Sequence, residues 1–432
     1  MNKIIFFNNK NFHRKFELIL RKKKHSDKRV EKTVMNIIES VKLGSDKAVL
    51  DLTRKYDKFP AKRFSDLIVT KKEIQEAKKE IPSNVIKALK NAYTRIKSYH
   101  QKQLPKDFYY TDKEGVKLGS RWTPIDSVGL YVPGGSASYP SSVIMNVVPA
   151  IVSKVKRIVM VCPANSGKIN PVVLAVADLV KVDEIYKIGG AQAIAALTYG
   201  TKNIKKVDKI FGPGNAYVAS AKKKVFGDVG VDMIAGPSEI LVVADEDNDP
   251  NHIAIDLLSQ AEHDENAQSI LITDSELFAK EVIRNINIEL KHLDRKKIAE
   301  KSWNNFGSII IVENILDSHL IINQLAPEHL EISIKKPNLL LKKVRNAGSI
   351  FLGKFSPEAI GDYIAGPNHV LPTDGTAKFS SGLNVLDFMK RTSIVECNKS
   401  SIKRIGPDAI VIASQEGLSA HAKSINKRLN KN

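Results

Sequence analysis

The sequence has few cysteines and no long apolar run, and each shortage excludes a class of protein. Its 432 residues include two cysteines, Cys162 and Cys397, which cannot build the disulfide framework of a small secreted domain. No apolar run approaches the ~18 residues that a membrane span needs. The opening MNKIIFFNNKNF has only four consecutive apolar residues, too few for the core of a signal peptide. We therefore expect a cytoplasmic protein.

Arginine and aromatic residues are also scarce, although the chain is strongly basic. The formal net charge is +20, yet only 14 of the 67 cationic residues are arginine, and aromatic residues make up 6% of the chain. The planar guanidinium of arginine gives the bidentate contacts typical of phosphate and base recognition, and no nucleic-acid-binding motif occurs. The excess of lysine, spread along the whole chain, indicates a compositional bias. A basic nucleic-acid-binding protein stays as a less favoured alternative.

Residues 26–103 have the apolar spacing of helices and carry no evident chemistry. Valine and isoleucine recur at helical intervals over residues 30–41, which predicts a helix for which Gly44 is a plausible stop. Thr70 and Glu73 have the spacing of a capping box at the start of another helix.

From residue 128 onward, short apolar runs that end in glycine or proline alternate with helical stretches. Four such strand-to-helix units come first, and the pattern resumes after Gly236, from EILVVAD to GSIFLG. This alternation predicts parallel sheets covered by helices. We expect an α/β fold with two tandem, incomplete Rossmann-like parallel-sheet domains, an N-terminal helical segment and a small C-terminal tail domain.

The same alternation predicts where the domains begin and end. We expect an N-terminal arm (1–27), a first α/β domain (28–130 plus 238–383), a second α/β domain (131–237) and a C-terminal tail (384–432). The tail contains a short piece, NVLDFMKRTSIVEC, and one helical stretch from Pro407 to Arg428. It is too small to bury a core of its own, so it must dock on another surface.

Glycine-rich turns follow three of the predicted strands: Gly134-Gly135, Gly189-Gly190 and Gly212-Pro213-Gly214. Glycine lets the backbone approach a phosphate closely, and the N-terminus of the next helix favours an anion. None matches the dinucleotide fingerprint G-x-G-x-x-G; GPGNAY comes closest, with Tyr217 in the last position. A nucleotide site and three ordinary tight turns both stay open as interpretations.

Polar residues able to do chemistry gather in the second half of the chain. Gln260 and His263 are three apart, on a predicted helix whose opposite face is apolar. The others lie in LAPEHLEI, in the loop IGDYIAGPNHVLPT and in the tail: Glu328, His329, Asp362, Tyr363, His369, Glu416 and His421. Histidine, carboxylate and amide oxygen suit zinc, but the motifs H-E-x-x-H and C-x-x-C are missing. Taken singly, each residue is more simply interpreted as a solvated or hydrogen-bonded polar residue.

Cys162 ends a predicted strand, where a thiol could attack an aldehyde. No histidine or cationic residue stands next to it in the sequence to lower its pKa. We therefore interpret Cys162 as a small buried apolar residue.

Taken together, these segments resemble the histidinol dehydrogenase family. The resemblance covers about residues 120–425, through GLYVPGGSASYPSSVIM, KIGGAQAIAAL, KIFGPGNAYV, DMIAGPSEILVVAD, LLSQAEHD, QLAPEHLEI, GDYIAGPNHVLPT, FSSGLNVLDFMKR and EGLSAHAKS. It implies a four-electron oxidation of L-histidinol, via histidinaldehyde, to L-histidine, the last step of histidine biosynthesis. It also implies two molecules of NAD per turnover and one zinc ion per subunit.

The resemblance further implies roles for particular residues. The expected zinc ligands are Gln260, His263, Asp362 and His421; His329 would be the general base, and Glu328 would activate water. Substrate contacts are expected from the four zinc ligands and from Ser238, His329 and Glu416, with His369 close by. NAD contacts are expected from Tyr131, Gln192 and Asn215. A homodimer with shared active sites, in which the tail docks on the partner subunit, is also implied.

One further alternative uses the same polar residues. A zinc-dependent hydrolase could employ the histidine, aspartate and glutamate set with a metal-bound water. Such an enzyme would have no use for three glycine-rich strand ends, so we favour the oxidoreductase.

Overall fold

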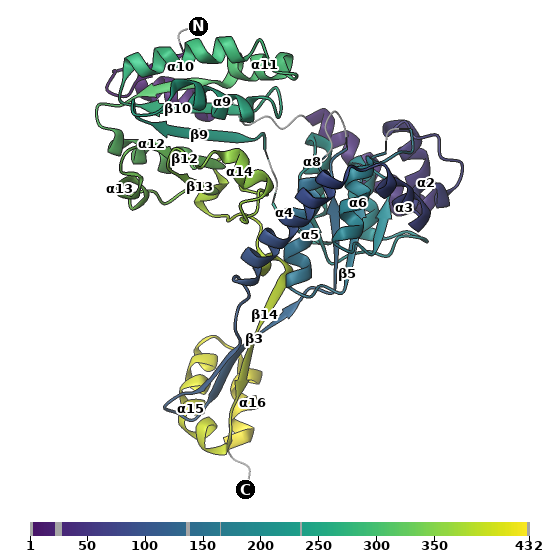
Figure 1. Ribbon diagram of the computed structural model, residues 1–432. Coiled ribbons are helices and arrows are strands. Elements are labelled where there is room, and N and C mark those ends of the chain that lie inside the picture. The colour runs from purple at the N-terminus through teal and green to yellow at the C-terminus, as the bar shows by residue number, and fades with distance from the viewer. Residues whose placement is uncertain (1–2, 22–27, 135–138, 165, 234–235, 430–432) are drawn as a thin grey trace.

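The computed structural model describes residues 3–21, 28–134, 139–164, 166–233 and 236–429 (Figure 1). Over these residues the chain forms two parallel sheets, each with helices packed on it, and a small antiparallel sheet that leads into the C-terminal tail. The expected α/β class with two parallel-sheet units is therefore confirmed. None of the described helices is long and apolar enough to cross a membrane.

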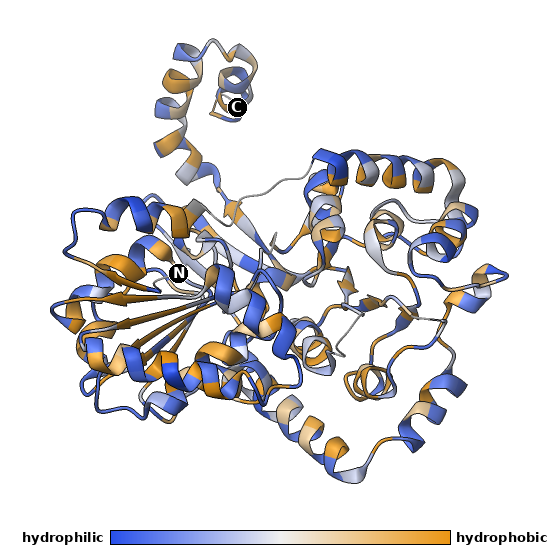
Figure 2. Ribbon diagram, turned by 90° about the horizontal axis from the view of Figure 1, so that it is seen from above, coloured by the Kyte–Doolittle hydropathy of each residue, from blue (hydrophilic) through white to orange (hydrophobic). Residues whose placement is uncertain are grey.

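The first parallel sheet has the strand order β1-β11-β10-β9-β12-β13. Its strands are β1 (Ile4–Phe6), β9 (Glu239–Ala244), β10 (Gln268–Thr273), β11 (Ser308–Ile311), β12 (His329–Ser333) and β13 (Ser349–Leu352). Strands β9, β10 and β12 are buried at every residue, as expected for a sheet covered on both faces. Figure 2 shows such strands in orange between helices that carry blue residues on their outer sides.

Helices cover both faces of this sheet. They are α1 (Phe12–Arg21), α9 (Pro250–Ala261), α10 (Glu276–Glu289), α11 (Lys296–Phe306), α12 (Ser318–Leu325) and α13 (Pro337–Leu341), with a 3-10 turn at Ile315–Asp317. Val242 belongs to the apolar core shared with α9, α10 and α11, whereas its neighbour Val243 packs with α1 and α12 on the other face. This alternation follows from the two-residue period of a strand. The pattern of the sequence did not predict β12, or β1 in the N-terminal arm.

The second parallel sheet has the order β6-β5-β4-β7-β8. Its strands are β4 (Ser127–Tyr131), β5 (Arg157–Val161), β6 (Glu184–Tyr186), β7 (Lys209–Phe211) and β8 (Gly230–Val231), and its helices are α5 (Pro140–Val152), α6 (Pro171–Leu179), α7 (Gly190–Tyr199) and α8 (Ala216–Val225). The four predicted strand-to-helix units are present. The chain runs outward from β4 through β5 to β6 and then returns to β7 on the other side of β4. Ligands of open α/β sheets bind at such a switch point, beyond the carboxyl ends of the strands.

Helices from the N-terminal part of the chain pack on this second sheet unit. They are α2 (Lys28–Tyr56), α3 (Lys71–Lys79) and α4 (Ser83–Gln101), with a 3-10 turn at Phe64–Leu67. Helix α2 contacts α7 and α8, α3 contacts α6, and α4 contacts α5. The predicted domain boundaries grouped residues 28–130 with 238–383 instead. Domain limits stay a prediction, but these contacts favour joining the helices of 28–101 to the second sheet.

Two local signals in this segment can be compared with the structure. Helix α3 begins at Thr70, whose hydroxyl accepts from the Glu73 N–H while the Glu73 carboxylate accepts from the Thr70 N–H, so the capping box is confirmed. The helical backbone breaks one residue beyond Gly44, at Ser45 (φ 49°, ψ −132°), and then resumes as far as Tyr56. The predicted stop is therefore a kink.

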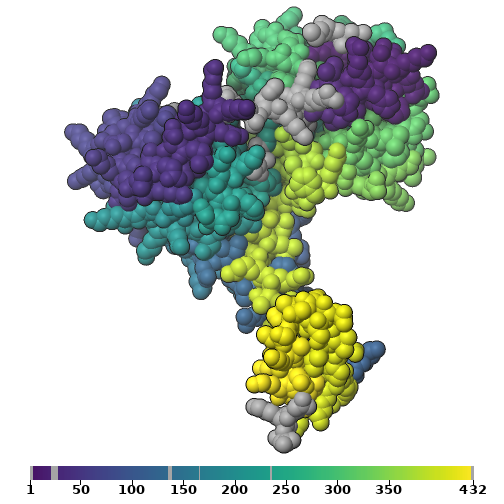
Figure 3. Space-filling model, turned by 180° about the vertical axis from the view of Figure 1, so that it is seen from behind, coloured from purple at the N-terminus to yellow at the C-terminus, as the bar shows by residue number. Residues whose placement is uncertain are grey.

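The C-terminal tail is attached through an antiparallel sheet of order β14-β3-β2. Its strands are β2 (Phe108–Thr111), β3 (Lys117–Pro124) and β14 (Met389–Glu396), and α15 (Lys399–Gln415) and α16 (Ser419–Leu429) follow. Strand β14 pairs with β3 over its whole length, from Met389 opposite Pro124 to Glu396 opposite Lys117. The tail forms a lobe set apart from both parallel sheets (Figures 1 and 3).

The predicted helix from Pro407 to Arg428 is wrong in its limits. Helix α15 begins earlier, where the side chain of Asn398 accepts hydrogen bonds from the backbone N–H groups of Ser400 and Ser401. It ends before Gly417, whose φ of 74° suits a residue without a Cβ. Two helices thus replace one.

Candidate active site

The polar residues converge at the amino ends of the central strands β9 and β12. His329 is the first residue of β12, and Glu328 directly precedes it. The Nδ1 of His329 donates to the carbonyl oxygen of Glu239 at 3.0 Å, and the Glu239 N–H donates to the Glu328 carboxylate at 2.9 Å. Both side chains are thus anchored to the first residue of β9. Because Nδ1 is the donor, Nε2 of His329 faces the rest of the site.

Two carboxylates of the short helix α14 (Glu358–Tyr363) face His329. Its Nε2 lies 3.6 Å from Glu358 Oε1 and 3.6 Å from Asp362 Oδ1. Burial by itself lowers the pKa of His329, but the carboxylates of Glu328, Asp362 and Glu358 outweigh it and raise the pKa to about 10. The imidazole therefore carries a proton at neutral pH when the protein is alone.

Burial dominates the titration of the two neighbouring glutamates. It raises the pKa of Glu328 to about 8, although the charge of His329 opposes the rise. It raises the pKa of Glu358 to about 7. The pKa of Asp362 is lowered, because its contact with His329 and the charge of His369 outweigh its burial. Two acids that titrate near neutrality thus lie beside one ionised carboxylate.

His263, just after the C-terminal end of α9, lies near the same cluster, because the charges of Asp362, His329 and His369 act on it. Gln260 lies in the last turn of the helix and is fully buried, while His263 follows the helix rather than extending it. Burial lowers the pKa of His263, and the nearby charge of Asp362 opposes this. His369 donates from Nδ1 to the Asp362 carbonyl oxygen at 2.9 Å, and its Nε2 lies 3.4 Å from the Ser142 hydroxyl of α5. Helix α5 belongs to the second sheet unit, so both units border this site.

The cluster has the donor set of a divalent cation. His329, Glu358 and Asp362 offer ligand atoms that lie within 4.8 Å of one another. Both amide atoms of Gln260, Nε2 of His329 and Oε1 of Glu358 are buried and have no hydrogen-bond partner among the described residues. Buried polar atoms are costly without a partner, and imidazole, carboxylate and amide oxygen are zinc ligands. A cation here would also weaken the hold of the carboxylates on the His329 proton. The residues present therefore fit a zinc ion.

Three acidic neighbours of the site were missed by the sequence analysis. Glu358 stands four residues before Asp362, a spacing that places both on one face of α14 and could have revealed it. Glu331 accepts from the Glu358 N–H, and Glu239 connects both catalytic candidates. Nothing in their local sequence distinguishes these last two from other strand residues.

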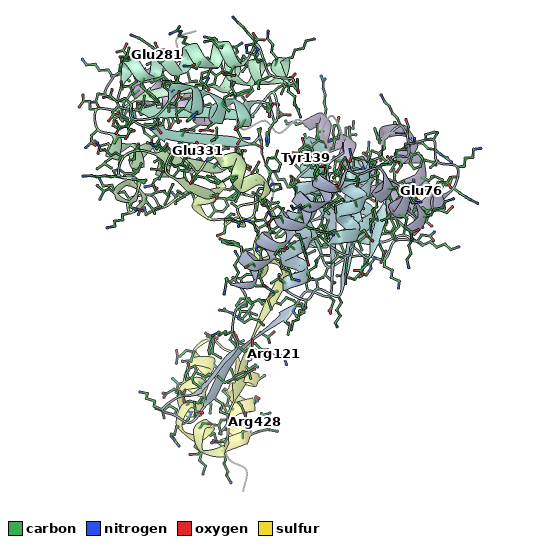
Figure 4. The ribbon with its side chains drawn as sticks, viewed as in Figure 1. Glu76, Arg121, Tyr139, Glu281, Glu331 and Arg428 are labelled. Carbon is green, nitrogen blue, oxygen red and sulfur yellow. The ribbon has the colours of Figure 1, made fainter. Side chains whose placement is uncertain are left out.

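The remaining predicted substrate contacts fall into two groups. Ser238 directly precedes β9, at the same strand edge as Glu239. Glu416, at the end of α15, and His421, on α16, are exposed on the tail. Figure 4 labels Arg428 in this lobe and Glu331 in the first sheet, at opposite ends of the molecule. Within one chain, the described structure does not bring Glu416 or His421 to the cluster.

The predicted NAD contacts lie at carboxyl ends of the second sheet. Tyr131 ends β4, and its buried hydroxyl accepts from the Gly190 N–H at 3.1 Å. Gln192 lies in the first turn of α7, buried, and Asn215 caps the N-terminus of α8. A Cβ on Gly212 would collide with the Tyr131 carbonyl oxygen, so only glycine allows β4 and β7 to end side by side. Gly135, in the first glycine-rich turn, lies outside the described residues.

Comparison with known proteins decides the family. Residues 20–429 match the histidinol dehydrogenase family. The chain belongs to the histidinol dehydrogenase family. It is 53% identical to the histidinol dehydrogenase of Rhodospirillum rubrum over 421 residues, 96% of each chain, and 53% identical to that of Agrobacterium fabrum over 419 residues, 97% of each.

The same family has a solved structure with this fold. A crystal structure of histidinol dehydrogenase from Elizabethkingia anophelis aligns with a TM-score of 0.94 at 36% identity, over 99% of this chain and 98% of that one. Membership of the histidinol dehydrogenase family confirms the resemblance seen in the sequence and the expected enzyme class, an NAD-dependent oxidoreductase.

Proposed function

We propose that the chain oxidises L-histidinol, via histidinaldehyde, to L-histidine with two molecules of NAD and a bound zinc ion. The observation that carries the proposal is the pairing of His329 with Glu328 next to the ligand atoms of Glu358 and Asp362, together with the buried, unpartnered amide of Gln260. A base, a second acid–base group and metal-ligand atoms thus share one buried site. The family match names the substrate.

His329 is the proposed general base. Its Nδ1 is engaged by the Glu239 carbonyl oxygen. With a cation that offsets the charge of the carboxylates, Nε2 would be unprotonated, and it is the atom that takes the proton of the alcohol as a hydride leaves the same carbon for NAD. The product of this step is the aldehyde. In the second oxidation the same atom takes a hydroxyl proton of the hydrated aldehyde, and a hydride leaves for a second NAD.

Glu328 is the proposed activator of water between the two oxidations. As water adds to the carbonyl carbon of histidinaldehyde, Glu328 takes the proton that the water loses and His329 returns its proton to the carbonyl oxygen. The product is the hydrated aldehyde, and Nε2 of His329 is again free to accept a proton. A carboxyl with a pKa of about 8 can accept and release a proton near neutrality. The scheme needs no thioester, so Cys162 has no part in it.

Gln260, His263 and Asp362 are the proposed zinc ligands from one chain, with His421 of the partner subunit as the fourth. Bound there, zinc would supply a Lewis acid that holds the nitrogen atoms of the substrate. His329 and Glu358 offer ligand atoms close to that of Asp362 and would lie next to the ion. Ser238 and the partner's Glu416 are the proposed contacts to the rest of the substrate.

A homodimer with shared sites would account for the placement of the tail. The tail exposes large apolar side chains, including Val411 and Ile412 at 61% each and Leu418 at 43%. Such residues are typical of a surface that docks on another protein. An element contributed by a partner in a two-fold dimer would bring Glu416 and His421 to a site that their own chain leaves incomplete. The cytoplasmic location expected from the sequence stays a prediction.

The proposal is tested by following NADH absorbance with histidinol and NAD. We expect two NADH per histidine formed, loss of turnover after chelation, and recovery with Zn²⁺ or Mn²⁺. The His263→Asn variant should retain less metal, whereas Glu328→Gln should keep the metal and lose rate. Full activity in a preparation verified to be metal-free would refute the zinc site. Hydrolytic activity with no formation of NADH would favour the alternative of a zinc-dependent hydrolase.

A further inference from the structure

A carboxylate from the N-terminal helices contacts the second glycine-rich turn. Asp57 directly follows α2, and its Oδ2 accepts from the Gly189 N–H at 2.8 Å and from Nε2 of Gln192 at 3.2 Å. A Cβ on Gly189 would lie 2.7 Å from Asp57 Oδ1 and 2.5 Å from the Pro163 Cβ. The glycine therefore makes room for the carboxylate. None of the roles assigned above involves Asp57.

This contact determines which end of the Gln192 amide faces the turn. An ionised carboxylate can only accept hydrogen bonds, so Gln192 must direct its NH₂ group toward Asp57. Its Oε1 then points the other way and lies 2.7 Å from the place where a Cβ of Gly190 would stand. Gly190 has φ +60° and no Cβ, so no side chain at position 190 covers that oxygen.

The side-chain amide of Asn215, which follows the third glycine-rich turn, is held by its oxygen and not by its NH₂ group. Oδ1 of Asn215 accepts from the backbone N–H groups of Tyr217 and Val218 at 3.0 and 3.2 Å. Its Nδ2 therefore points away from α8, and none of the described residues accepts a hydrogen bond from it. One turn thus presents a hydrogen-bond acceptor and the other a donor, each at the N-terminus of a helix.

We propose that Asp57 is a positioning residue that holds Gln192 with its carbonyl oxygen toward the dinucleotide, so that the Gly189-Gly190 turn recognises a hydroxyl or amino donor. A phosphate offers acceptors and negative charge. Here the Gly189 N–H that could bind it is already used, and the Asp57 carboxylate would repel it. Asn215, whose NH₂ group is free and which has no carboxylate bound to it among the described residues, suits the phosphate instead. The inference rests on the proposed NAD site.

The test is the variant Asp57→Ala, which removes the one oxygen that accepts from both the Gly189 N–H and Nε2 of Gln192. The Gln192 amide is then no longer held with its oxygen toward the ligand. We expect the KM for NAD to rise about tenfold, as for the loss of one hydrogen bond that leaves a buried partner unpaired, while kcat at saturating NAD changes less than twofold.

A matched control and a rescue separate positioning from general stability. Asp51→Asn removes a carboxylate on the same helix, paired with Arg54 at the surface, and should leave the KM for NAD and the unfolding temperature unchanged. The conservative variant Asp57→Asn is the rescue: its side-chain oxygen can accept both hydrogen bonds, so the KM for NAD should stay within about threefold of the parent value. A role of the negative charge alone predicts that Asp57→Asn raises the KM for NAD as much as Asp57→Ala does.

Calorimetry identifies the part of the cofactor involved and does not depend on turnover. AMP and nicotinamide mononucleotide are titrated separately into the parent protein and into Asp57→Ala. If the variant binds one of the two ligands more weakly than the parent does, the inference is supported and that ligand contains the donor. If the variant binds both ligands as tightly as the parent, or if its KM for NAD is unchanged, the inference is overturned. If the parent protein binds NAD but makes no NADH from histidinol, the proposed function fails while this inference stands on the binding data.

Discussion

The two parallel sheets contribute opposite ends to the proposed chemistry. The first sheet contributes the amino ends of β9 and β12, where the C-terminus of α9 brings in Gln260. The second contributes the carboxyl ends of β4, β6 and β7, of which β6 leads into the N-terminus of α7 and β7 into that of α8. A helix C-terminus carries partial negative charge and favours a cation, whereas an N-terminus favours an anion. The partial charges of these helix termini thus favour a metal ion at the first sheet and a phosphate at the second.

The side chains at these two ends differ in the same way. The first end gathers titratable groups whose pKa values are displaced, with Glu328 at about 8 and His329 at about 10. The second end relies on glycine conformations and on neutral amides held by backbone groups or by Asp57. Substitutions at the first end should therefore affect rate, and those at the second should affect the binding of NAD.

The largest expected effect tests the titratable end. His329→Asn should lower the rate of both oxidations by roughly 10²–10⁴-fold, the range for loss of a general base. Glu328→Gln should slow the oxidation of added histidinaldehyde more than that of histidinol, because only the aldehyde step needs activated water. Single-turnover measurements of the two steps are compared. Equal losses in both steps for both variants would show that the roles are not divided in this way.

A second prediction concerns which subunit supplies His421 to the site of the first sheet. His329→Asn and His421→Asn proteins, each inactive, are refolded together. If the tail comes from the partner, a mixed dimer has one site with both lesions and one with none, so about a quarter of the parent activity should return. Differential tags confirm that mixed dimers formed. A mixture that stays inactive although mixed dimers have formed would show that each site uses the tail of its own chain.

A smaller effect is expected at the glycine end. Gly189→Ala would set a Cβ 2.5 Å from the Pro163 Cβ and 2.7 Å from Asp57 Oδ1, which must displace the turn. We expect the KM for NAD to rise about tenfold or more, with the metal content unchanged. Gly353→Asn, at a position with φ +84° and open space around it, is the control and should leave the KM for NAD unaltered. A loss of metal in Gly189→Ala would contradict the separation of the two ends.

The smallest effect is expected for the thiol of Cys162, which follows β5 at the glycine end. Burial raises the pKa of this thiol to about 12, so the reactive thiolate is scarce near neutral pH and increases only as the pH approaches that value. Cys162→Ala should keep full activity, and an alkylating reagent at neutral pH should modify the exposed Cys397 alone. Peptide mapping after labelling measures this. Rapid modification of Cys162 with loss of activity would revive a thioester route.

Local patterns predicted part of the fold well, and the failures have identifiable causes. The β-α units were predicted correctly because buried parallel strands are short continuous apolar runs. Strand β12 was not predicted, because His329 and Glu331 interrupt its apolar run, although both are buried. The tail was predicted as one helix because polar residues such as Ser400 conceal where α15 begins.

The sequence by itself determined the fold class, the family and most of the polar residues that the first sheet gathers, because these are encoded in apolar periodicity and in ordered motifs. It could not place Glu358 and Glu239 beside His329, or Asp57 beside Gln192. Those neighbours are separated by up to 135 residues, and only the packing of strands and helices brings them together. The tertiary structure alone also put Glu416 and His421 far from the cluster of their own chain, since β14 pairs with β3 and carries the tail away.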